Sequence, residues 1–424
     1  MLESDMRTLR KTYADAALET DPFEKFNRAQ GAGSVRDPYP GLAAMRAIAP
    51  IHRLDLKALM GEARPMLGGM PDEIFTVLTY DGVWEVLRDG ARFSSAGYAR
   101  SMGLVMGHTI LEMDGEEHIR YRGLISKAFT RRALERWERD LVRPVVEEYV
   151  GAFAERGSAD LVRELTFPFP VRVIAEMMGL PQEDHDTFHR LAVELISVGI
   201  DWEGGTRASR ELGELFKPVI QARRREPHDD LISVLAHAEL DGLRLRDEEI
   251  LAFLRLLAPA GAETTYRSSS NLLYGLLSSP DQLDALRADP ALVPQAIEEG
   301  LRWEPPLLSI MRTTTTDTNL CGMNVPAGSA VSVNLGAANR DPSRWSDPDR
   351  FDLFRAPKPH IAFAFGQHVC LGMHLARMET RVLLETLFAR LPGLRLDPAA
   401  EDVHITGMIF RAPLSLPVCF EPRR

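Results

Sequence analysis

The sequence predicts a mainly α-helical protein with a small β portion. Apolar residues recur at helical spacing through most of the chain after Gly115, and the longest such stretch runs from Asp247 to Leu277. Short alternating segments, which predict strands, are confined to two places before Gly90, to residues 307–342 and to the C-terminal end. With 424 residues, 45% of them hydrophobic, the chain can bury a substantial core.

The first 90 residues contain an arm and the first strands. Residues 1–38 show little periodicity and are expected to form a partly ordered arm, which leaves residues 39–424 for one folded domain. A short helix is expected over Tyr39–Ile48, followed by strands over Ile51–Leu54 and Ile74–Leu78.

The segment Gly90–Gly115 has no clear periodicity, and a loop of this length is usually functional or disordered. Its apolar side chains suit an adaptable apolar wall, although methionine is also ordinary core filler. These side chains include Met102, Val105, Met106 and Ile110.

Helices then dominate, separated by breaks such as Pro181 and the pair Gly204–Gly205. A further helix is expected after an N-cap at Asp229 or Asp230, another begins at Pro294, and the stretch 403–420 predicts a β-hairpin. The other expected helices span Glu116–Phe129, Leu134–Phe153, Phe167–Met178, Asp184–Val198 and Arg207–Arg225.

The long helical stretch Asp247–Leu277 contains residues that disfavour a helix. Pro259 lacks an amide hydrogen and Gly261 is costly in a helix interior, by about 3 and about 1 kcal/mol respectively. Glu263 and Thr264 follow at once. A loosened backbone there could let the carboxylate and hydroxyl hold a water or pass a proton; the alternative is a kinked helix in which threonine bonds to its own turn.

Cys370 stands in the stretch FAFGQHVCLG, residues 363–372, before an amphipathic helix. The apolar stripe of that helix is Leu371, Leu375, Met378 and Val382, and its charged residues, Glu379 among them, are expected off the stripe. A helix N-terminus and nearby cations lower the pKa of a thiol and favour the thiolate, which is the ligand form. Gly366 and Gly372 would permit a tight turn or close approach of a flat ligand.

Two other interpretations of Cys370 stay open at this point. A lone cysteine is often a small buried hydrophobe, and Cys370 with His374 could be half of a zinc site. The other cysteines, Cys321 and Cys419, have unrelated surroundings and no paired spacing, which argues against zinc and against a disulfide framework.

Composition excludes other classes of function. A formal net charge of −11 argues against nucleic acid as a partner. The first thirty residues are polar and mixed in charge, and no apolar run approaches the roughly 18 to 20 residues that span a bilayer, so we expect a soluble, cytoplasmic protein without a membrane span.

The order Phe363, Gly366, His368, Cys370, Gly372 resembles the haem-binding loop of the cytochrome P-450 superfamily of haem-thiolate monooxygenases, in its soluble bacterial form. The resemblance implies a single-domain fold, a triangular prism of helices with haem b (iron protoporphyrin IX) between the long central helix and the helix after the cysteine. It also implies that Cys370 is the axial thiolate ligand of the iron, which pushes electron density toward O–O cleavage in this class.

Further motifs follow in the family's order. His118 and Arg122, one helical turn apart, would otherwise be read as a solvated face; they and Arg312 are similar to the family's propionate-binding residues. The stretch AGAETT resembles the oxygen-activation motif at Ala260, Gly261, Glu263 and Thr264. That match implies that Thr264 stabilises bound dioxygen and that Glu263 relays protons.

A structural ion pair and a substrate pocket are also implied. Glu299 and Arg302, on their own a weak surface pair, resemble the family's buried Glu–Arg pair, which Arg355, or failing that Arg350, would complete. The pocket would be lined by apolar side chains, so a lipid, terpenoid, steroid or polyketide is expected rather than a sugar. The candidates are Met102, Val105, Met106, Ile110, Leu256, Leu308, Ile310, Met408 and Ile409, with Ala260 and residues 195–200 beside them.

The resemblance therefore implies an enzyme that inserts one oxygen atom from O₂ into an apolar small molecule. The chain has no flavin or iron–sulfur module, so electrons from NAD(P)H would arrive through a ferredoxin or flavodoxin-like partner. A basic patch of Lys127, Arg131, Arg132 and Arg377 would receive that partner. The alternatives are a peroxide-driven or isomerising haem-thiolate enzyme and a non-catalytic haem sensor.

Overall fold

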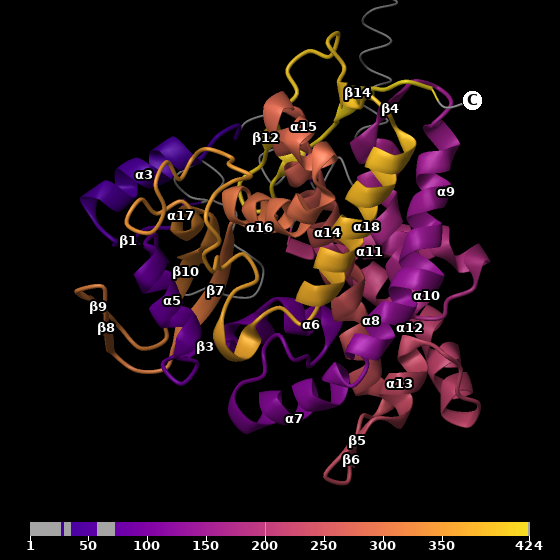
Figure 1. The fold of residues 1–424 in the computed structure, drawn as a ribbon. Coiled ribbons are helices and arrows are strands. Elements are labelled where there is room, and N and C mark those ends of the chain that lie inside the picture. The colour runs from indigo at the N-terminus through magenta and orange to yellow at the C-terminus, as the bar shows by residue number, and fades with distance from the viewer. Residues whose placement is uncertain (1–26, 29–34, 57–72, 200, 423–424) are drawn as a thin grey trace, which may run out of the picture.

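Helices form most of the protein, as the sequence predicts (Figure 1). The structure is a computed structural model that describes residues 27–28, 35–56, 73–199 and 201–422. Its helices are α3 (Tyr39–Ile48), α5 (Tyr80–Arg88), α6 (Met102–Met106), α7 (Gly115–Ser126), α8 (Arg131–Trp137), α9 (Arg143–Phe153), α10 (Pro168–Met177), α11 (His185–Ile196), α12 (Trp202–Arg225), α13 (Leu231–His237), α14 (Asp247–Leu277), α15 (Pro280–Ala288), α16 (Val293–Trp303), α17 (Leu335–Asn339) and α18 (Met373–Arg390).

A five-stranded mixed sheet lies to one side of these helices (Figure 1). Its order is β1-β2-β10-β7-β3; β2 and β10 run parallel, with Val333 beside Val77, and the other neighbours are antiparallel. Its strands are β1 (Ile51–Arg53), β2 (Ile74–Val77), β3 (Phe93–Ser94), β7 (Ser309–Thr314) and β10 (Ala330–Asn334).

The remaining strands form small antiparallel groups: β5 with β6, β8 with β9, β12 with β13, and β14 between β11 and β4. They are β4 (Ser158–Asp160), β5 (Glu239–Leu240), β6 (Leu243–Arg244), β8 (Thr318–Leu320), β9 (Met323–Val325), β11 (Arg395–Leu396), β12 (Ile405–Thr406), β13 (Ala412–Pro413) and β14 (Pro417–Cys419). The expected C-terminal hairpin is thus confined to β12 and β13.

The central helix α14 has the predicted bounds and is unbroken, although Pro259 lies inside it. A Cβ on Gly261 would lie 2.7 Å from a methyl carbon of Ile174 in α10, so the glycine lets these two helices pack closely. The helix thus continues past both residues, although Pro259 has no N–H to donate to the carbonyl of Arg255, one turn earlier.

Three other expectations differ from the structure. Gly204 and Gly205 lie within the first turn of α12 and do not separate helices; a Cβ on Gly205 would lie 2.5 Å from Val198, so this glycine serves close packing. The short helix α17 was not expected and begins after Asn334, whose side chain caps it. The segment Gly90–Gly115 holds a short strand and two short helical segments.

The predicted N-terminal arm lies mostly outside the described residues. Within it, the side chain of Asn27 is buried and hydrogen-bonds to Arg267 of α14. None of the described helices combines the length and the apolar character needed to cross a membrane.

Candidate functional site

Cys370 lies three residues before the first residue of α18. Its backbone N–H donates to the carbonyl of Phe363 over 2.9 Å, and the guanidinium of Arg377 lies 4.6 Å from the centre of the Phe363 ring. Cys370 is exposed to open space, yet protein surrounds its sulfur closely enough for burial to dominate its pKa. A sulfur set within the protein but still accessible is suited to binding a ligand.

The charge state of this thiol differs from the expectation. Burial raises the pKa of Cys370 above its ordinary value, and the Gly372 N–H, Arg122 and Arg377 oppose that shift without cancelling it. The helix end and the cations therefore do not produce the thiolate by themselves. Coordination to a metal ion deprotonates a thiol outright, so metal binding is the stronger source of the thiolate form.

The two glycines beside Cys370 serve different purposes. Gly366 has φ of 76°, and a Cβ there would lie 2.3 Å from the carbonyl oxygen of Leu87, a position that only glycine fills without strain. Gly372 has φ of −83°, and a Cβ on it would meet no protein atom within 4 Å. Gly366 thus makes the turn, and the surroundings of Gly372 leave room for a flat ligand to approach the backbone.

His118 is buried on α7, and neither of its ring nitrogens has a hydrogen-bond partner among the residues that the structure describes. Its ring lies 4.2 Å from the ring of His368, centre to centre. Burial, followed by the charges of His368 and Arg122, lowers the pKa of His118 to about 4. Buried polar groups are almost always paired, so this imidazole fits an acceptor that the described part of the chain does not supply.

Two guanidiniums near His118 lack a carboxylate partner among the described residues. Arg122 donates from Nη2 to the carbonyl of Val369 over 2.6 Å, and Arg312 donates from Nη1 to the carbonyl of Met311 over 2.7 Å. Burial lowers the pKa of both, and neither makes an ion pair with a carboxylate of the described chain. Two such cations with one unpartnered imidazole match the two propionates of haem, so the residues present fit that group.

Asp114 was not singled out from the sequence, yet it fixes the cysteine loop. It accepts hydrogen bonds from the Ser94 hydroxyl (2.5 Å) and the Ser95 amide (3.0 Å), and from the Gln367 side chain (3.1 Å). Its Oδ1 also lies 3.3 Å from Nε2 of His368. The only signal in the sequence is its place just before α7, where an aspartate is a common N-cap.

The middle of α14 contains three consecutive polar residues, Glu263, Thr264 and Thr265, and each has a different partner. Thr264 is half-buried, and its hydroxyl donates to the carbonyl of Ala260, an exposed residue one turn earlier. Glu263 is buried and pairs with Arg267, with 2.9 Å between Oε2 and Nε. The structure therefore joins Glu263 to Arg267 and not to Thr264, and the threonine makes the bond to its own turn that the sequence left as the alternative.

Thr265 points toward α18, where its hydroxyl meets Glu379. The sequence placed Glu379 off the buried stripe of that helix, but the side chain is only 1% exposed. The prediction was wrong because α14 and α18 pack closely enough to enclose the charged edge of the stripe. Period alone does not show how wide a stripe the neighbouring helices cover.

Glu299 of α16 is buried and joins two arginines. Its carboxylate makes two hydrogen bonds of 2.7 Å with Arg302 and one of 3.2 Å with Nε of Arg355. Arg350 contributes only its backbone carbonyl, which accepts from both guanidiniums. The first of the two arginines considered is therefore the one that reaches Glu299.

The expected pocket residues divide into two groups. Met102, Leu256, Ile310 and Ile409 are partly exposed, whereas the other five are buried in clusters of apolar side chains. Val105, Met106 and Ile110 belong to the main core, and Leu308 and Met408 pack in a separate cluster with Tyr39. In this structure the first group contributes more surface that a substrate could contact.

Comparison with known proteins places this geometry in a family. The family model described as Cytochrome P450 matches residues 171–392. The chain is 36% identical over 404 residues to Cytochrome P450 monooxygenase PikC of Streptomyces venezuelae, covering 92% of each chain. It is 36% identical over 387 residues to Mycinamicin IV hydroxylase/epoxidase of Micromonospora griseorubida, covering 87% of this chain and 96% of the relative.

A solved structure agrees along nearly the whole length. The crystal structure of CYP109E1 from Bacillus megaterium in complex with testosterone superposes with a TM-score of 0.80 at 32% identity, covering 91% of this chain and 99% of the other. The expected single-domain helical fold is confirmed by this likeness. The chain therefore belongs to the cytochrome P450 family of haem-dependent monooxygenases, which incorporate oxygen from O₂ into their substrates.

Proposed function

We propose that the protein inserts one oxygen atom from dioxygen into an apolar small molecule, by hydroxylation or epoxidation. The observation that carries the proposal is the presence in one P450 chain of both Cys370 and the acid–alcohol pair Glu263–Thr264. Relatives named as a monooxygenase and a hydroxylase/epoxidase support the same reaction class.

The roles of the chain's residues follow from their positions. When bound, haem supplies the activation of dioxygen, assisted by electron density from the cysteine sulfur. Cys370 would bind its iron, and His118, Arg122 and Arg312 would hold its propionates through charge-assisted hydrogen bonds. Further haem contacts would come from Ala260, Phe363, Gly366, His368 and Gly372.

Thr264 and Glu263 would handle protons. The Thr264 hydroxyl can turn from the Ala260 carbonyl to donate to another acceptor on the face of α14 that these two residues share, because a threonine hydroxyl rotates to suit its partner. Glu263 would resupply the proton, directly or through a water. Glu299, Arg302 and Arg355 would have a structural role and hold the segment that precedes the cysteine loop.

Turnover of Thr264→Ala tests this assignment. We expect product formation to fall while consumption of NAD(P)H and release of peroxide continue, because oxygen is still reduced but its protons arrive in the wrong place. Coupling equal to that of the wild type would show that Thr264 does not handle protons.

Electrons would come from NAD(P)H through a separate ferredoxin or flavodoxin-like carrier. Of the basic patch expected to receive it, Arg131 pairs with Glu135 and Arg377 makes two bonds to Glu298, so part of its charge is neutralised. Lys127 donates to the carbonyl of Glu239, and Arg132 is exposed. Raising the ionic strength should still slow reduction by an acidic carrier, and salt-independent reduction would exclude this docking mode.

The substrate would be a lipid, terpenoid, steroid or polyketide, because the candidate lining is apolar. The testosterone complex of the structural relative is consistent with a substrate of this kind. Screening such compounds for a shift of the haem absorption band on binding would identify the class. A screen in which only sugars shift the band would contradict the proposal.

Two other functions were weighed. A peroxide-driven or isomerising haem-thiolate enzyme often lacks the acid–alcohol pair, so Glu263 and Thr264 argue against it. A haem sensor would be expected to carry an effector region, which the sequence does not suggest. Hydroxylation assays with surrogate redox partners, in parallel with peroxide alone, would separate the three. We also propose a cytoplasmic location and a single domain over residues 39–424.

A further inference from the structure

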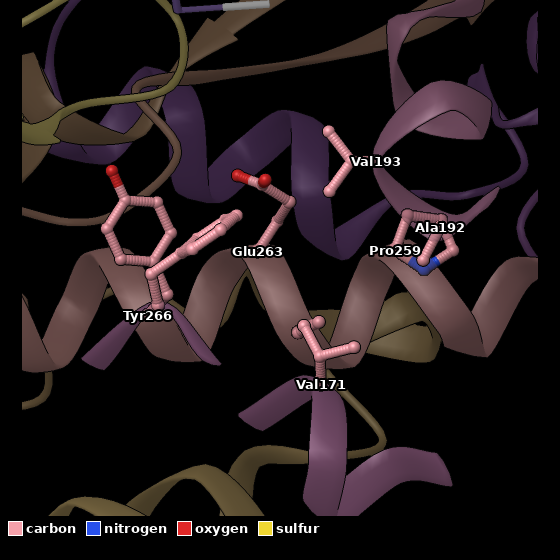
Figure 2. A pocket seen from close by; sticks show the side chains of 8 residues that line it. Val171, Ala192, Val193, Pro259, Glu263 and Tyr266 are labelled. Carbon is pink, nitrogen blue, oxygen red and sulfur yellow. The ribbon is translucent and has the colours of Figure 1, made fainter. Parts of the chain in front are cut away.

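The carboxylate of Glu263 is turned away from the face of α14 that carries Thr264. Residues four apart share a helix face, so Ala260 and Thr264 form one face and Glu263 and Arg267 another. Figure 2 shows Glu263 projecting from α14 between Val193 of α11 on one side and Tyr266 on the other, and these residues line one cavity together with Ala192. The cavity there has room for about one water molecule, and Glu263 supplies its only carboxylate among the described lining residues.

Arg267 fixes this orientation. It is 1% exposed and donates from Nε to Oε2 of Glu263 over 2.9 Å. Its guanidinium also lies 5.0 Å from the ring of Tyr266 and 5.4 Å from the ring of Phe410. Separating the two partners of a buried ion pair is costly, because it leaves each charge uncompensated. The Glu263 carboxylate is therefore held firmly on this face.

A second contact holds the arginine from another part of the chain. Nη2 of Arg267 donates to Oδ1 of Asn27 over 3.0 Å, and Asn27 is 2% exposed. Asn27 lies 240 positions before Arg267 in the sequence. The N-terminal segment thus reaches the arginine that pairs with the proposed proton donor.

We propose that Arg267, supported by Asn27, is a positioning residue that holds the Glu263 carboxylate on the face of α14 that lines this cavity and so controls its delivery of protons to Thr264. The inference rests on the proposed function of the Glu263–Thr264 pair. To serve Thr264, the carboxylate must leave Arg267 or act through a water in the adjoining cavity. The strength of the Arg267 contact then sets how readily the proton is supplied.

The test compares four variants of the full-length, haem-loaded protein. Arg267→Lys keeps the charge, Arg267→Met removes it at similar length, and Asn27→Leu removes the side-chain oxygen that accepts from Arg267. Asn271→Leu is the matched control, because Asn271 is fully buried on the same helix and bonds to the carbonyls of Glu304 and Arg411 without touching Glu263. A normal carbon monoxide spectrum shows that a variant has folded around its haem.

The first readout is infrared absorption of the Glu263 carboxyl, isolated by subtracting the spectrum of the same protein carrying Glu263→Gln. We expect the band of the Glu263 carboxyl to keep its position in Arg267→Lys and to shift in Arg267→Met, because its position reports the charge-assisted hydrogen bond that Glu263 accepts from Arg267. An unchanged band in Arg267→Met would overturn the inference.

The second readout is the fraction of NAD(P)H consumption that ends in product. We expect it to change severalfold in Arg267→Met and Asn27→Leu, to return most of the way in Arg267→Lys, and to match the wild type in Asn271→Leu. If the control changes as much as Asn27→Leu, the contact is merely structural and the inference is wrong. Should Arg267→Met fail to fold, Asn27→Leu decides alone, and wild-type coupling in it overturns the inference. A failure of Thr264→Ala to uncouple the enzyme would refute the proposed proton role separately, whatever the infrared result.

Discussion

The hydroxyl of Thr265 donates a hydrogen bond of 3.1 Å to Oε2 of Glu379, which joins the central helix α14 to α18, the helix that follows the cysteine. Oε1 of the same carboxyl has no partner in the described chain. Burial raises the pKa of Glu379 to about 8, and the bond from Thr265 offsets only part of that shift. Glu379 is therefore mostly protonated at neutral pH, and its partner Thr265 directly follows Thr264 in α14.

This buried carboxyl should make stability depend on pH. Between its ordinary pKa of 4.5 and the folded value of about 8, the folded protein keeps a proton that the unfolded chain loses, so stability falls as pH rises through that window. The slope approaches about 1.4 kcal/mol per pH unit. Glu379→Gln should remove this contribution, which urea unfolding at several pH values would measure.

Glu385→Gln on the same helix is the control. Burial raises the pKa of Glu385, but hydrogen bonds from Arg381 and Arg143 outweigh it and the pKa is lowered. The contribution of Glu385 to stability therefore changes with pH below pH 4.5 and not above it. If Glu379→Gln and Glu385→Gln alter the pH dependence between 4.5 and 8 equally, Glu379 does not carry the proton.

The Glu299 cluster should distinguish Arg355 from Arg350. Arg355→Leu removes a charged bond to Glu299 and three bonds to backbone carbonyls, of which that of Ser346 keeps no other donor among the described residues, so we expect a loss of about 3 kcal/mol or more in the free energy of unfolding. Arg350→Leu should change it by no more than about 0.5 kcal/mol, because only the backbone of Arg350 takes part. Denaturant unfolding of the two variants measures the difference, and equal losses would contradict the assignment.

Haem retention should depend on His118. His118→Leu removes a donor that lies unpartnered and buried, so we expect haem to be lost to an acceptor protein about tenfold faster, equivalent to about 1.4 kcal/mol. Arg120→Leu changes an exposed residue of the same helix and should release haem at the wild-type rate. Unaltered retention in His118→Leu would remove His118 from the haem site.

Those parts of the molecule that follow from local pattern could be predicted from the sequence. The apolar run and the acidic first turn of α14 set its bounds correctly, and the spacing around Cys370 identified the loop that carries it. The sequence named Arg355 before Arg350 as the further arginine of the Glu299 cluster, and Arg355 is the one whose side chain contacts Glu299.

The sequence could not show which side chains tertiary packing would bring together. Glu379 has an ordinary position on an amphipathic helix, and only the approach of α14 buries it. Asn27 and Arg267 are 240 positions apart, so no local pattern connects them. The role of Gly205 was missed for the same reason: the residue does not break a helix but allows close packing against Val198, which is a tertiary contact.

The bond between the sulfur of Cys370 and a haem iron is the central claim, and the spectrum of the reduced protein under carbon monoxide tests it most directly. We predict the strongly red-shifted Soret band of an axial thiolate in the wild type and its absence in Cys370→His. A freshly prepared, fully haem-loaded wild type without that band would contradict the account.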